Sequence, residues 1–492
     1  MKHYSGKSIS ALLAALMLLS SFAACGETAD TPSPASTTAA QNTDAPAAEE
    51  TTAEPEIMTD VPADLNFGGK TIRVLSWETT SYNTQLIADQ MNGEVLNDAL
   101  YERTAKVEEM LGLKIAETRE NQPTPIIQKL IAAGDDAYDI MFTVDRDALS
   151  IAQNGNILPI TSLPYVDVTR EYWSQSMNED ISMLNRLYFS YGDFNLSGYE
   201  GVNTLMFNKS MSDDFGLADH YDTILSGKWT LDLLGENMIK VVADLNGDGV
   251  FNDDDRYGLT SHPKQVLPCF WIASGLRSVE KDENDAPVFR MAENQKFATF
   301  WSKIFTMMYS DNVYHDSSHL PDYANNTVFM NGQALYNIVR VAFLHFYRDC
   351  DIDYGLIPYP KWDEAQEVYY SRFEGGSLMV VTDFAANKDM AGAFMEVMAC
   401  ESMKTVIPAY YDVVLKNKYA RDERSVEMLD LIYGNRINDL GDTFWCGQIR
   451  DGVFAGKFAS NKSDYESTIA KMQKSVDKAL QKAIDLFSAI EG

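Results

Sequence analysis

Short strands alternate with amphipathic helices through the first part of this chain. A strand at 71–77 is followed by a helix at 94–111, a strand at 113–115, a helix at 125–133 and a strand at 138–142. The strands show alternating or continuous apolar residues, and apolar residues recur every three or four positions in the helices. Strands that alternate with helices favour parallel βαβ units. The sequence therefore predicts an open α/β sheet.

Side chains that follow the strands of such a sheet are candidates for ligand binding. Ligands bind outside the carboxyl ends of the strands in open α/β sheets. Trp77, Glu78 and Tyr82 follow the first strand, whereas Asp145 and Arg146 follow the third. We expect these five residues to lie near a ligand.

The N-terminus has the pattern of an export signal. Lys2 and Lys7 precede an apolar run at 11–19 and small residues before Cys25. This predicts a signal peptide over 1–24, too short to span a bilayer comfortably. Ala-Ala-Cys resembles a bacterial lipoprotein signal, in which Cys25 becomes lipidated, although Phe22 replaces the usual Leu. The alternative is a secretory signal with an incidental cysteine.

The residues after Cys25 have the composition of a tether. Residues 26–60 are mostly Thr, Ala, Pro, Glu, Asp and Ser. Such a segment buries too little apolar surface to offset the entropy of ordering, so we expect disorder. About 35 flexible residues would span roughly 30 Å. The prediction is a lipidated Cys and disordered tether over 25–64, which keeps a globular part near the cell membrane.

Charge and cysteine content restrict the partners of the chain. The formal net charge is −32, from 40 Lys and Arg against 72 Asp and Glu. This balance disfavours nucleic-acid binding, because no basic stripe would neutralise phosphates. Cys269, Cys350, Cys400 and Cys446 form no CxxC motif. They could pair as two disulfides, but buried free thiols are the favoured interpretation.

The order of motifs along the mature chain resembles the extracellular solute-binding proteins of ABC transporters, in the carbohydrate-type family. Each motif is weak alone, and their order and spacing carry the resemblance. In chain order they are the strand that ends in Trp77, a long helix, YDI, GNILPI, FNK, KWT, the DLNGDG loop, FMNGQALYN, YGLIPYP, EGGSLMVV and a long Ala/Met-rich helix.

The resemblance implies a fold and a division of the chain. The fold class is α/β, with two lobes of the periplasmic-binding-protein type, a multi-strand hinge and an interlobe cleft. The implied segments are lobe one at 65–200, lobe two at 201–355, the rest of lobe one at 356–402 and the rest of lobe two at 403–492.

The stretch from Arg186 to Ser210 is where the resemblance places the first crossing between lobes. Two strands are expected, Leu187–Phe194 and Thr204–Asn208, around a connector that contains Gly198 and Gly201. From the local pattern alone the stretch is equally an ordinary hairpin. The family pattern favours a hinge suited to domain closure.

A twelve-residue segment at 244–255 matches a calcium-binding loop. Oxygen ligands occupy positions 1, 3, 5, 9 and 12, Gly249 takes the turn at position 6, and the carbonyl of position 7 completes the set. The expected ligands are Asp244, Asn246, Asp248, Val250, Asn252 and Asp255. Asp replaces the usual Glu at position 12, which shortens the last ligand. The alternative is an acidic turn without metal.

The resemblance extends the set of expected ligand contacts. By position along the family pattern it adds Asp193, Trp271, Arg340 and Trp445 to the five residues at the strand ends. Core packing is the alternative for each aromatic. Arg146 and Arg340 would suit an acidic sugar if they bind a carboxylate.

The resemblance implies a lipid-anchored, extracytoplasmic, monomeric receptor that binds a soluble carbohydrate and delivers it to an ABC permease in the membrane. It implies no enzymatic activity, and the loop at 244–255 adds the expectation of a structural Ca²⁺. A secreted glycoside-active enzyme and a polysaccharide-binding surface protein without transport are the alternatives. His315 and His319 have the i, i+4 spacing of zinc ligands, but the sequence offers no evident third ligand.

Overall fold

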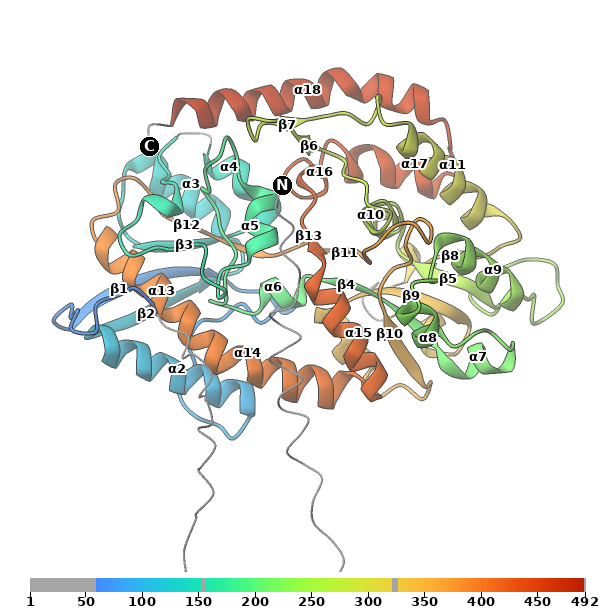
Figure 1. Ribbon diagram of the computed structural model, residues 1–492, viewed down its shortest axis with the longest axis horizontal. Helices are drawn as coiled ribbons and strands as arrows, with labels where there is room; N and C mark the ends of the chain where they lie inside the picture. The colour runs from blue at the N-terminus through green and yellow to red at the C-terminus, as the bar shows by residue number, and fades with distance from the viewer. Residues whose placement is uncertain (1–58, 153–154, 321–325, 491–492) are drawn as a thin grey trace, which may run out of the picture. The chain divides into compact units, whose positions relative to one another are not determined.

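The computed structural model describes residues 59–152, 155–320 and 326–490, which belong to one compact unit. The predicted signal peptide, Cys25 and nearly all of the predicted tether lie outside these residues. Two main sheets organise the described part (Figure 1).

The first sheet is mixed and contains the βαβ units expected from the sequence. Its order is β12-β3-β1-β2, in which β1 pairs parallel with β2 and β3, and β12 pairs antiparallel with β3. The strands are β1 (Lys70–Trp77), β2 (Leu113–Glu120), β3 (Ile140–Val144) and β12 (Ser377–Val380). The helical segments on this side are α2 (Val95–Leu111), α3 (Pro123–Ala133), η1 (Asp145–Asp147), α4 (Ala148–Ala152), η2 (Ile160–Ser162), α5 (Gln175–Ile181), α13 (Lys388–Lys404), α14 (Val406–Pro408) and η5 (Ala409–Tyr419).

The second sheet has the order β10-β4-β9-β5-β8. Strands β9, β5 and β8 run parallel to one another, while β4 pairs antiparallel with β9 and β10. The strands are β4 (Asn203–Asn208), β5 (Tyr257–Ser261), β8 (Tyr314–Asp316), β9 (Ala334–Arg340) and β10 (Tyr354–Ile357). The helical segments around it are α7 (Lys209–Asp214), α8 (His220–Leu225), α9 (Leu231–Val241), η3 (Ser317–His319), α12 (Thr327–Met330), η4 (Val341–Tyr347) and α15 (Glu423–Gly434).

Three chain segments lie side by side between the two sheets (Figure 1). Val202 bridges to Phe373, and the short parallel strands β11 (Ser371–Arg372) and β13 (Arg436–Ile437) pair next to this bridge. The short helix α6 (Ser197–Glu200) leads into the first of these segments. This arrangement gives the polypeptide three adjacent passages between the sheets.

Further helices pack beside both sheets, and α18 contacts α4 at one end and α11 at the other. They are α10 (Pro263–Ala273), α11 (Gln295–Tyr309), α16 (Leu440–Thr443), η6 (Arg450–Phe454), α17 (Ala455–Ala459) and α18 (Tyr465–Ala489), with the small hairpin β6 (Glu280–Lys281) and β7 (Pro287–Val288). No helix among the described residues is long and apolar enough to cross a membrane.

The prediction of a strand over Leu187–Phe194 is wrong. The structure has only isolated bridges there, between Ser190 and Met379 and between Gly192 and Trp173. The backbone N–H groups of Ser190, Tyr191 and Asp193 donate to three different partners, the Met379 carbonyl, the Asn178 side chain and the Tyr172 carbonyl. Its aromatic side chains are buried, so apolar packing and not a strand ladder produces the pattern. The second expected strand is confirmed as β4.

Among the described residues, all four cysteines are free. Cys269, Cys400 and Cys446 are buried, and Cys350 is half-buried. This agrees with the favoured interpretation of the sequence.

Candidate functional site

The carboxyl ends of strands from both sheets meet at one cavity of about 290 Å³. Trp77 ends β1, Val144 ends β3, His262 follows β5 and Arg340 ends β9. This convergence is the arrangement in which open α/β sheets bind ligands. We call this space the main cavity; it is lined by Trp77, Thr79, Ser81, Tyr82, Val144, Asp145, Arg146, His262, Lys264, Gln265, Arg340, Glu374, Gly375, Asp442, Thr443, Arg450 and Asp451.

An aromatic pair forms part of the wall. The ring centroids of Trp77 and Tyr82 lie 5.6 Å apart with an interplanar angle of 44°. The Tyr82 hydroxyl accepts a hydrogen bond from Arg340 Nη1, which comes from the second sheet. This contact therefore links the two sheets across the cavity.

Glu374 lies among three guanidinium groups. Its Oε2 accepts from Arg450 Nη1 at 2.7 Å and from Arg372, and its Oε1 lies 3.1 Å from Arg340 Nη2. Burial opposes ionisation of this carboxyl, but the three positive charges outweigh burial and lower the pKa of Glu374. Asp442 lies in the same network and accepts from Arg372 Nε at 2.6 Å.

Asp145 joins the first sheet to the segment after Glu374. Its Oδ2 accepts the backbone N–H groups of Gly375 at 2.8 Å and Gly376 at 2.9 Å. Burial raises the pKa of Asp145 to about 6, although the N–H donors of Gly376, Arg146 and Gly375 favour the charged form. The carboxylate thus fixes a glycine turn whose Gly375 has φ +79°.

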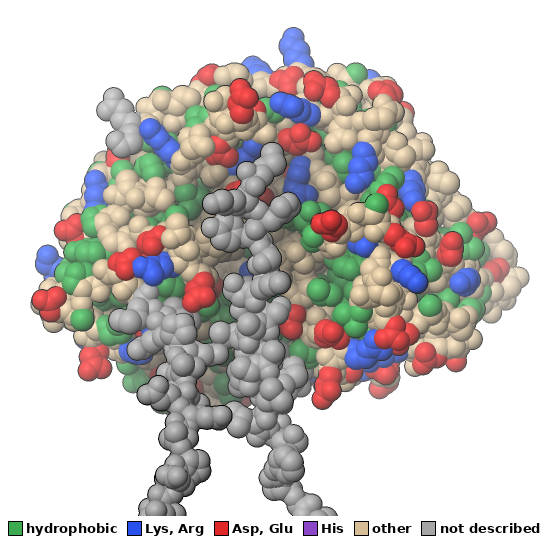
Figure 2. Space-filling view, viewed as in Figure 1, with side chains coloured by type: hydrophobic (Ala, Val, Ile, Leu, Met, Phe, Trp, Pro, Cys, Tyr) green, Lys and Arg blue, Asp and Glu red, His purple; other side chains and the backbone are tan. Residues whose placement is uncertain are grey.

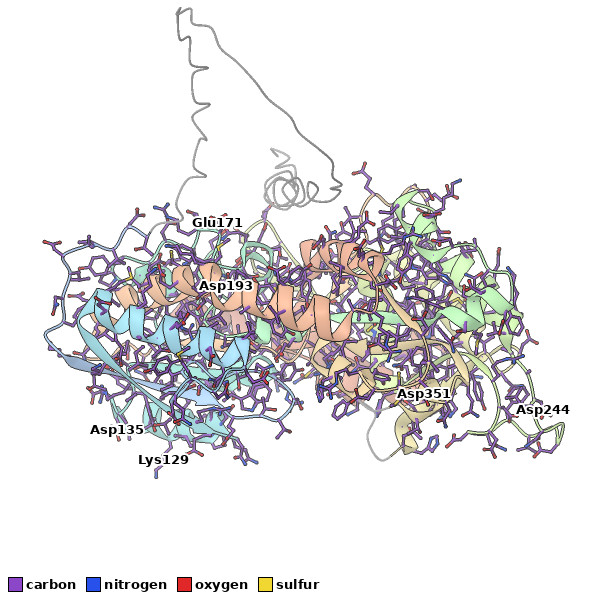
Figure 3. All side chains as sticks on the ribbon, turned by 90° about the horizontal axis from the view of Figure 1, so that it is seen from below. Lys129, Asp135, Glu171, Asp193, Asp244 and Asp351 are labelled. Carbon is purple, nitrogen blue, oxygen red and sulfur yellow. The ribbon has the colours of Figure 1, made fainter. Side chains whose placement is uncertain are left out.

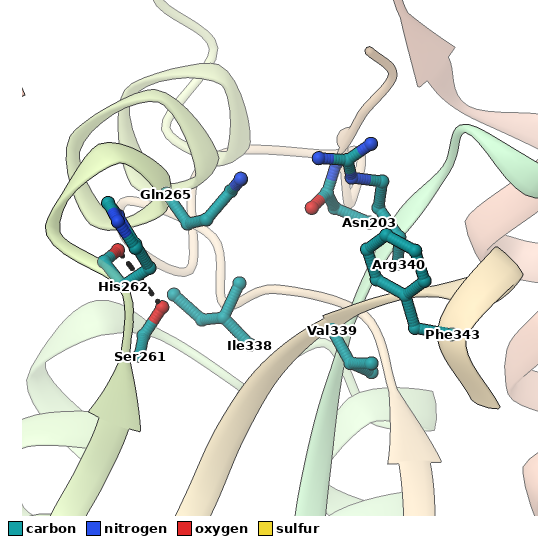
Figure 4. Close-up of a pocket in the computed structure, with 8 residues that line it drawn as sticks. All are labelled: Asn203, Ser261, His262, Gln265, Ile338, Val339, Arg340 and Phe343. Carbon is teal, nitrogen blue, oxygen red and sulfur yellow. Dashed lines mark hydrogen bonds between the residues drawn. The ribbon is translucent and has the colours of Figure 1, made fainter. Parts of the chain in front are cut away.

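A smaller recess adjoins the main cavity. It is shown in Figure 4 and is lined by Asn203, Ser261, His262, Gln265, Ile338, Val339, Arg340 and Phe343. Gln265 from α10 and Arg340 from β9 approach it from opposite sides. Its volume of about 10 Å³ admits a water molecule but no sugar ring.

Five of the nine residues expected to contact ligand line the main cavity: Trp77, Tyr82, Asp145, Arg146 and Arg340. Glu78 is exposed beside the strand end, and its carboxylate lies 4.0 Å from Arg119. Asp193 accepts from the Tyr199 hydroxyl at 3.0 Å and lies outside the lining, at the place marked in Figure 3.

Neither of the other two expected tryptophans lines the main cavity. Trp271 is fully buried, and its indole N–H donates to Asp439 Oδ2 at 2.8 Å. Trp445 is buried with its ring 6.2 Å from that of Phe444. Both positions have the surroundings of core residues, which was the alternative interpretation of each aromatic.

Sequence reasoning missed several residues of the lining. His262, Lys264 and Gln265 come from the start of α10, directly after the parallel strand β5. Their position directly after a parallel strand is the signal that marks them, because ligands bind beyond the carboxyl ends of such strands. Asp442, Thr443, Arg450 and Asp451 come from α16 and η6 and follow no strand of either main sheet. No local pattern marks these four.

The chain resembles solved binding proteins over most of its length. A cyclo/maltodextrin-binding protein complexed with maltotetraose matches with a TM-score of 0.58 at 12% identity, over 84% of this chain and 98% of that one. The ABC substrate-binding protein Lmo0181 from Listeria monocytogenes, in complex with cycloalternan, matches with a TM-score of 0.53 at 12% identity, over 84% and 99%. The chain has the two-lobe fold of ABC solute-binding proteins.

A third neighbour shows that this fold accepts other ligands. UgpB from Mycobacterium tuberculosis, in complex with glycerophosphocholine, matches with a TM-score of 0.52 at 16% identity, over 85% of this chain and 98% of that one. No protein-family model and no curated protein matches the sequence. At these identities the likeness concerns the fold.

Proposed function

We propose that this protein is the receptor of an ABC importer and binds a carbohydrate in the main cavity. The observation that carries the proposal is the meeting of strand ends from both sheets around an aromatic pair and many hydrogen-bonding side chains. Two neighbours of the same fold were solved with an oligosaccharide.

The chemistry of the lining suits a polyhydroxylated ligand. The faces of Trp77 and Tyr82 offer apolar surface for the C–H groups of a sugar ring. Arg146 and Lys264 can donate hydrogen bonds to a ligand, whereas Asp451 can accept them. Because positive and negative groups occur together, a neutral molecule with several hydroxyl groups matches the cavity better than a simple ion does.

The proposed mechanism is ligand-stabilised closure. Tyr82 reaches the cavity from the first sheet and Arg340 from the second, so a bound ligand would contact both lobes only when they are closed. A ligand shifts a population of conformers by its differential affinity for them. The passages at 200–203, 371–376 and 435–438 would supply the hinge.

Delivery to a permease and anchoring to the cell membrane belong to the same proposal. Their support is the sequence: an export signal that ends at Cys25, a tether after it and an acidic composition suited to solubility. Acidic and basic side chains are interspersed on the face shown in Figure 2.

We also propose that the loop at 244–255 binds Ca²⁺. Both oxygens of Asp244 accept backbone N–H groups of the loop, from Gly247 and Gly249 at 2.7 Å each. Gly249 has φ +78°, as a turn at position 6 requires. Asp255 is fully buried and joins the two ends of the loop, because it accepts from Leu245 and Asn252 at 2.9 Å each.

The donor set of the loop suits this ion. The side-chain oxygens of Asp244, Asn246 and Asp248 accept backbone N–H groups of the same loop. Together with the carbonyl of Val250 and the side chains of Asn252 and Asp255 they would supply the all-oxygen shell that Ca²⁺ prefers. Figure 3 shows Asp244 at the outer edge of the side that carries the second sheet.

A thermal-shift panel tests the proposed function. Mono- and oligosaccharides, uronic acids, glycerophosphocholine, amino acids and peptides are compared, and we expect a carbohydrate to raise the unfolding temperature. Trp77→Ala should abolish the shift, whereas Trp362→Ala should keep it, because Trp362 does not line the main cavity and its ring contacts Lys296 and Lys303. A shift with amino acids or peptides alone would refute the carbohydrate assignment.

A glycoside-active enzyme is the second candidate, because two carboxyls of the main cavity have divergent pKa values. The pKa of Asp145 is raised and that of Glu374 is lowered, a pattern typical of acid–base pairs. Both carboxylates are nevertheless engaged, Asp145 by backbone N–H groups and Glu374 by guanidiniums. Product release from an oligosaccharide that binds would establish the enzyme, and bound ligand recovered intact supports the receptor.

A further inference from the structure

Two histidines and an aspartate meet at the edge of the second sheet. His315 lies on the edge strand β8, His319 on η3, and Asp253 in the loop at 244–255. His315 Nε2 lies 2.9 Å from Asp253 Oδ1, and His319 Nε2 lies 2.9 Å from Asp253 Oδ2. The potential ligand atoms of the three residues lie within 4.8 Å of one another. The structure thus supplies the third ligand that the histidine spacing lacks in the sequence.

The second nitrogen of each imidazole is already engaged with an oxygen. His319 Nδ1 lies 2.9 Å from the backbone oxygen of Asp316, which can only accept, so Nδ1 carries the proton. His315 Nδ1 lies 2.9 Å from Thr260 Oγ1, a hydroxyl that accepts a hydrogen bond when Nδ1 carries the proton. Such contacts orient the ring and leave the Nε2 lone pair for a metal, as in established metal sites.

The spacing between Asp253 and each histidine nitrogen is close to that around a tetrahedral ion. Ligands at about 2.0–2.1 Å from zinc are separated by roughly 3.3 Å in a tetrahedron. The Nε2–Oδ distances of 2.9 Å require an opening of only a few tenths of an ångström. The side chains of His319 and Asp253 are 54% and 49% exposed, so water can reach the site as a fourth ligand.

We propose that Asp253, His315 and His319 bind a divalent transition-metal ion, with Zn²⁺ as the best match. Imidazole nitrogens combined with one carboxylate favour zinc over the hard ions Ca²⁺ and Mg²⁺, which prefer oxygen ligands.

This site is separate from the proposed calcium site and from the main cavity. Asp253 is position 10 of the twelve-residue loop and is not one of the six expected calcium ligands. None of the three residues lines the main cavity. Gln333 Nε2 donates to the Asp253 carbonyl at 2.6 Å and already ties this part of the loop to the sheet. A bound ion would add a second link, between the loop and the segment formed by β8 and η3. We therefore expect it to stabilise the folded state.

Zinc binding to the full chain tests the proposal. The protein is prepared without a histidine tag, saturated with Ca²⁺ and titrated with Zn²⁺ against a chelating dye. We expect one tight site that raises the unfolding temperature. Asp253→Asn and His319→Ala should each weaken zinc binding at least about tenfold.

Matched controls separate this site from other ligands in the chain. Asp254→Asn changes the exposed neighbouring carboxylate, and His345→Ala removes an exposed histidine of η4, so both should bind zinc as the wild type does. Co²⁺ should give visible d–d absorption without a thiolate charge-transfer band. Absence of a tight site, binding unaffected by both test variants, or a thiolate band would each overturn the proposal. The exposed His319 keeps the test valid if Asp253→Asn fails to fold.

Discussion

Arg340 Nη2 lies 3.1 Å from Glu374 Oε1, and this contact joins the end of β9 to the chain segment that returns to the first sheet. Arg340 also donates to Tyr82, so one guanidinium contacts residues from both sides of the main cavity. Glu374 in turn contacts Arg372 and Arg450. A ligand that alters the position of Arg340 would therefore act on the segment between the lobes.

Glu374→Gln should destabilise the protein by about 3–5 kcal/mol, because it neutralises the carboxylate that contacts all three guanidiniums and leaves only Asp442 to balance Arg372 and Arg450. Urea denaturation measures the change. Asp451→Asn is the matched control: this carboxylate contacts Arg450 at 2.9 Å from a partly exposed position, and its loss should cost about 1 kcal/mol or less. An equal decrease in the free energy of unfolding in the two variants would contradict the central role of Glu374.

Gly201→Ala should impair closure. An added Cβ would lie 2.5 Å from Phe373 Cε2 and 2.7 Å from the Glu374 carbonyl oxygen, where two passages between the sheets touch. We expect a loss of about 1–3 kcal/mol in stability and a smaller change in small-angle scattering on ligand addition.

Gly198→Ala provides the comparison for this prediction. A Cβ at Gly198 meets no atom of the described residues within 4 Å, so stability, ligand affinity and the scattering change should match the wild type, apart from the few tenths of a kcal/mol typical of such changes. If Gly201→Ala also closes normally, these passages are not the hinge.

Calcium should raise the unfolding temperature by a few degrees without changing ligand choice, because it binds the folded loop. The measurement is a melt in zinc-free buffer with Ca²⁺ or EGTA. Asp248→Asn should reduce the calcium-dependent shift, and Asp254→Asn should leave it intact. If the unfolding temperature of the wild type is the same with Ca²⁺ and with EGTA, the proposed calcium site is refuted.

Local sequence patterns predict the parts of this fold that depend on local interactions. The βαβ units around β1, β2 and β3 follow from periodicity, and the rule of strand ends places Trp77, Tyr82, Asp145 and Arg146 at one cavity. The same patterns do not distinguish a strand from packed aromatic coil, as the segment 187–194 shows. There, hydrogen bonds to scattered partners replace a ladder.

The rest of the site depends on contacts between distant segments. Arg450 and Asp442 reach Glu374 and Arg372 only after η6 packs against α10 and these distant segments come together. Trp271 occupies an apolar helix whose pattern fits either a buried or a ligand-facing ring, and only tertiary packing decides between them. Asp253 is likewise separated by 62 residues from His315, so sequence spacing could not join them.

Glu200 gives the protein a pH dependence that a single variant can isolate. This carboxyl is 3% exposed, and burial raises its pKa to about 7, although the Asn83 backbone and side chain each donate to it at 2.5 Å. In the unfolded chain it ionises near its ordinary value of about 4.3. Between these pH values the folded state binds more protons than the unfolded state, so the free energy of unfolding falls as pH rises from about 4 to about 7.

Glu200→Gln should remove this component of the pH dependence, which amounts to roughly 4 kcal/mol at about 1.36 kcal/mol for each pH unit. The measurement is urea denaturation at several pH values between 4 and 8. Glu427→Gln, an exposed carboxyl on α15, should retain the wild-type profile. A Glu200→Gln profile parallel to that of the wild type would show that Glu200 ionises at the same pH in both states. The stability difference between the two proteins should be largest above pH 7, where the buried carboxylate is charged and only the wild type bears the cost of that charge.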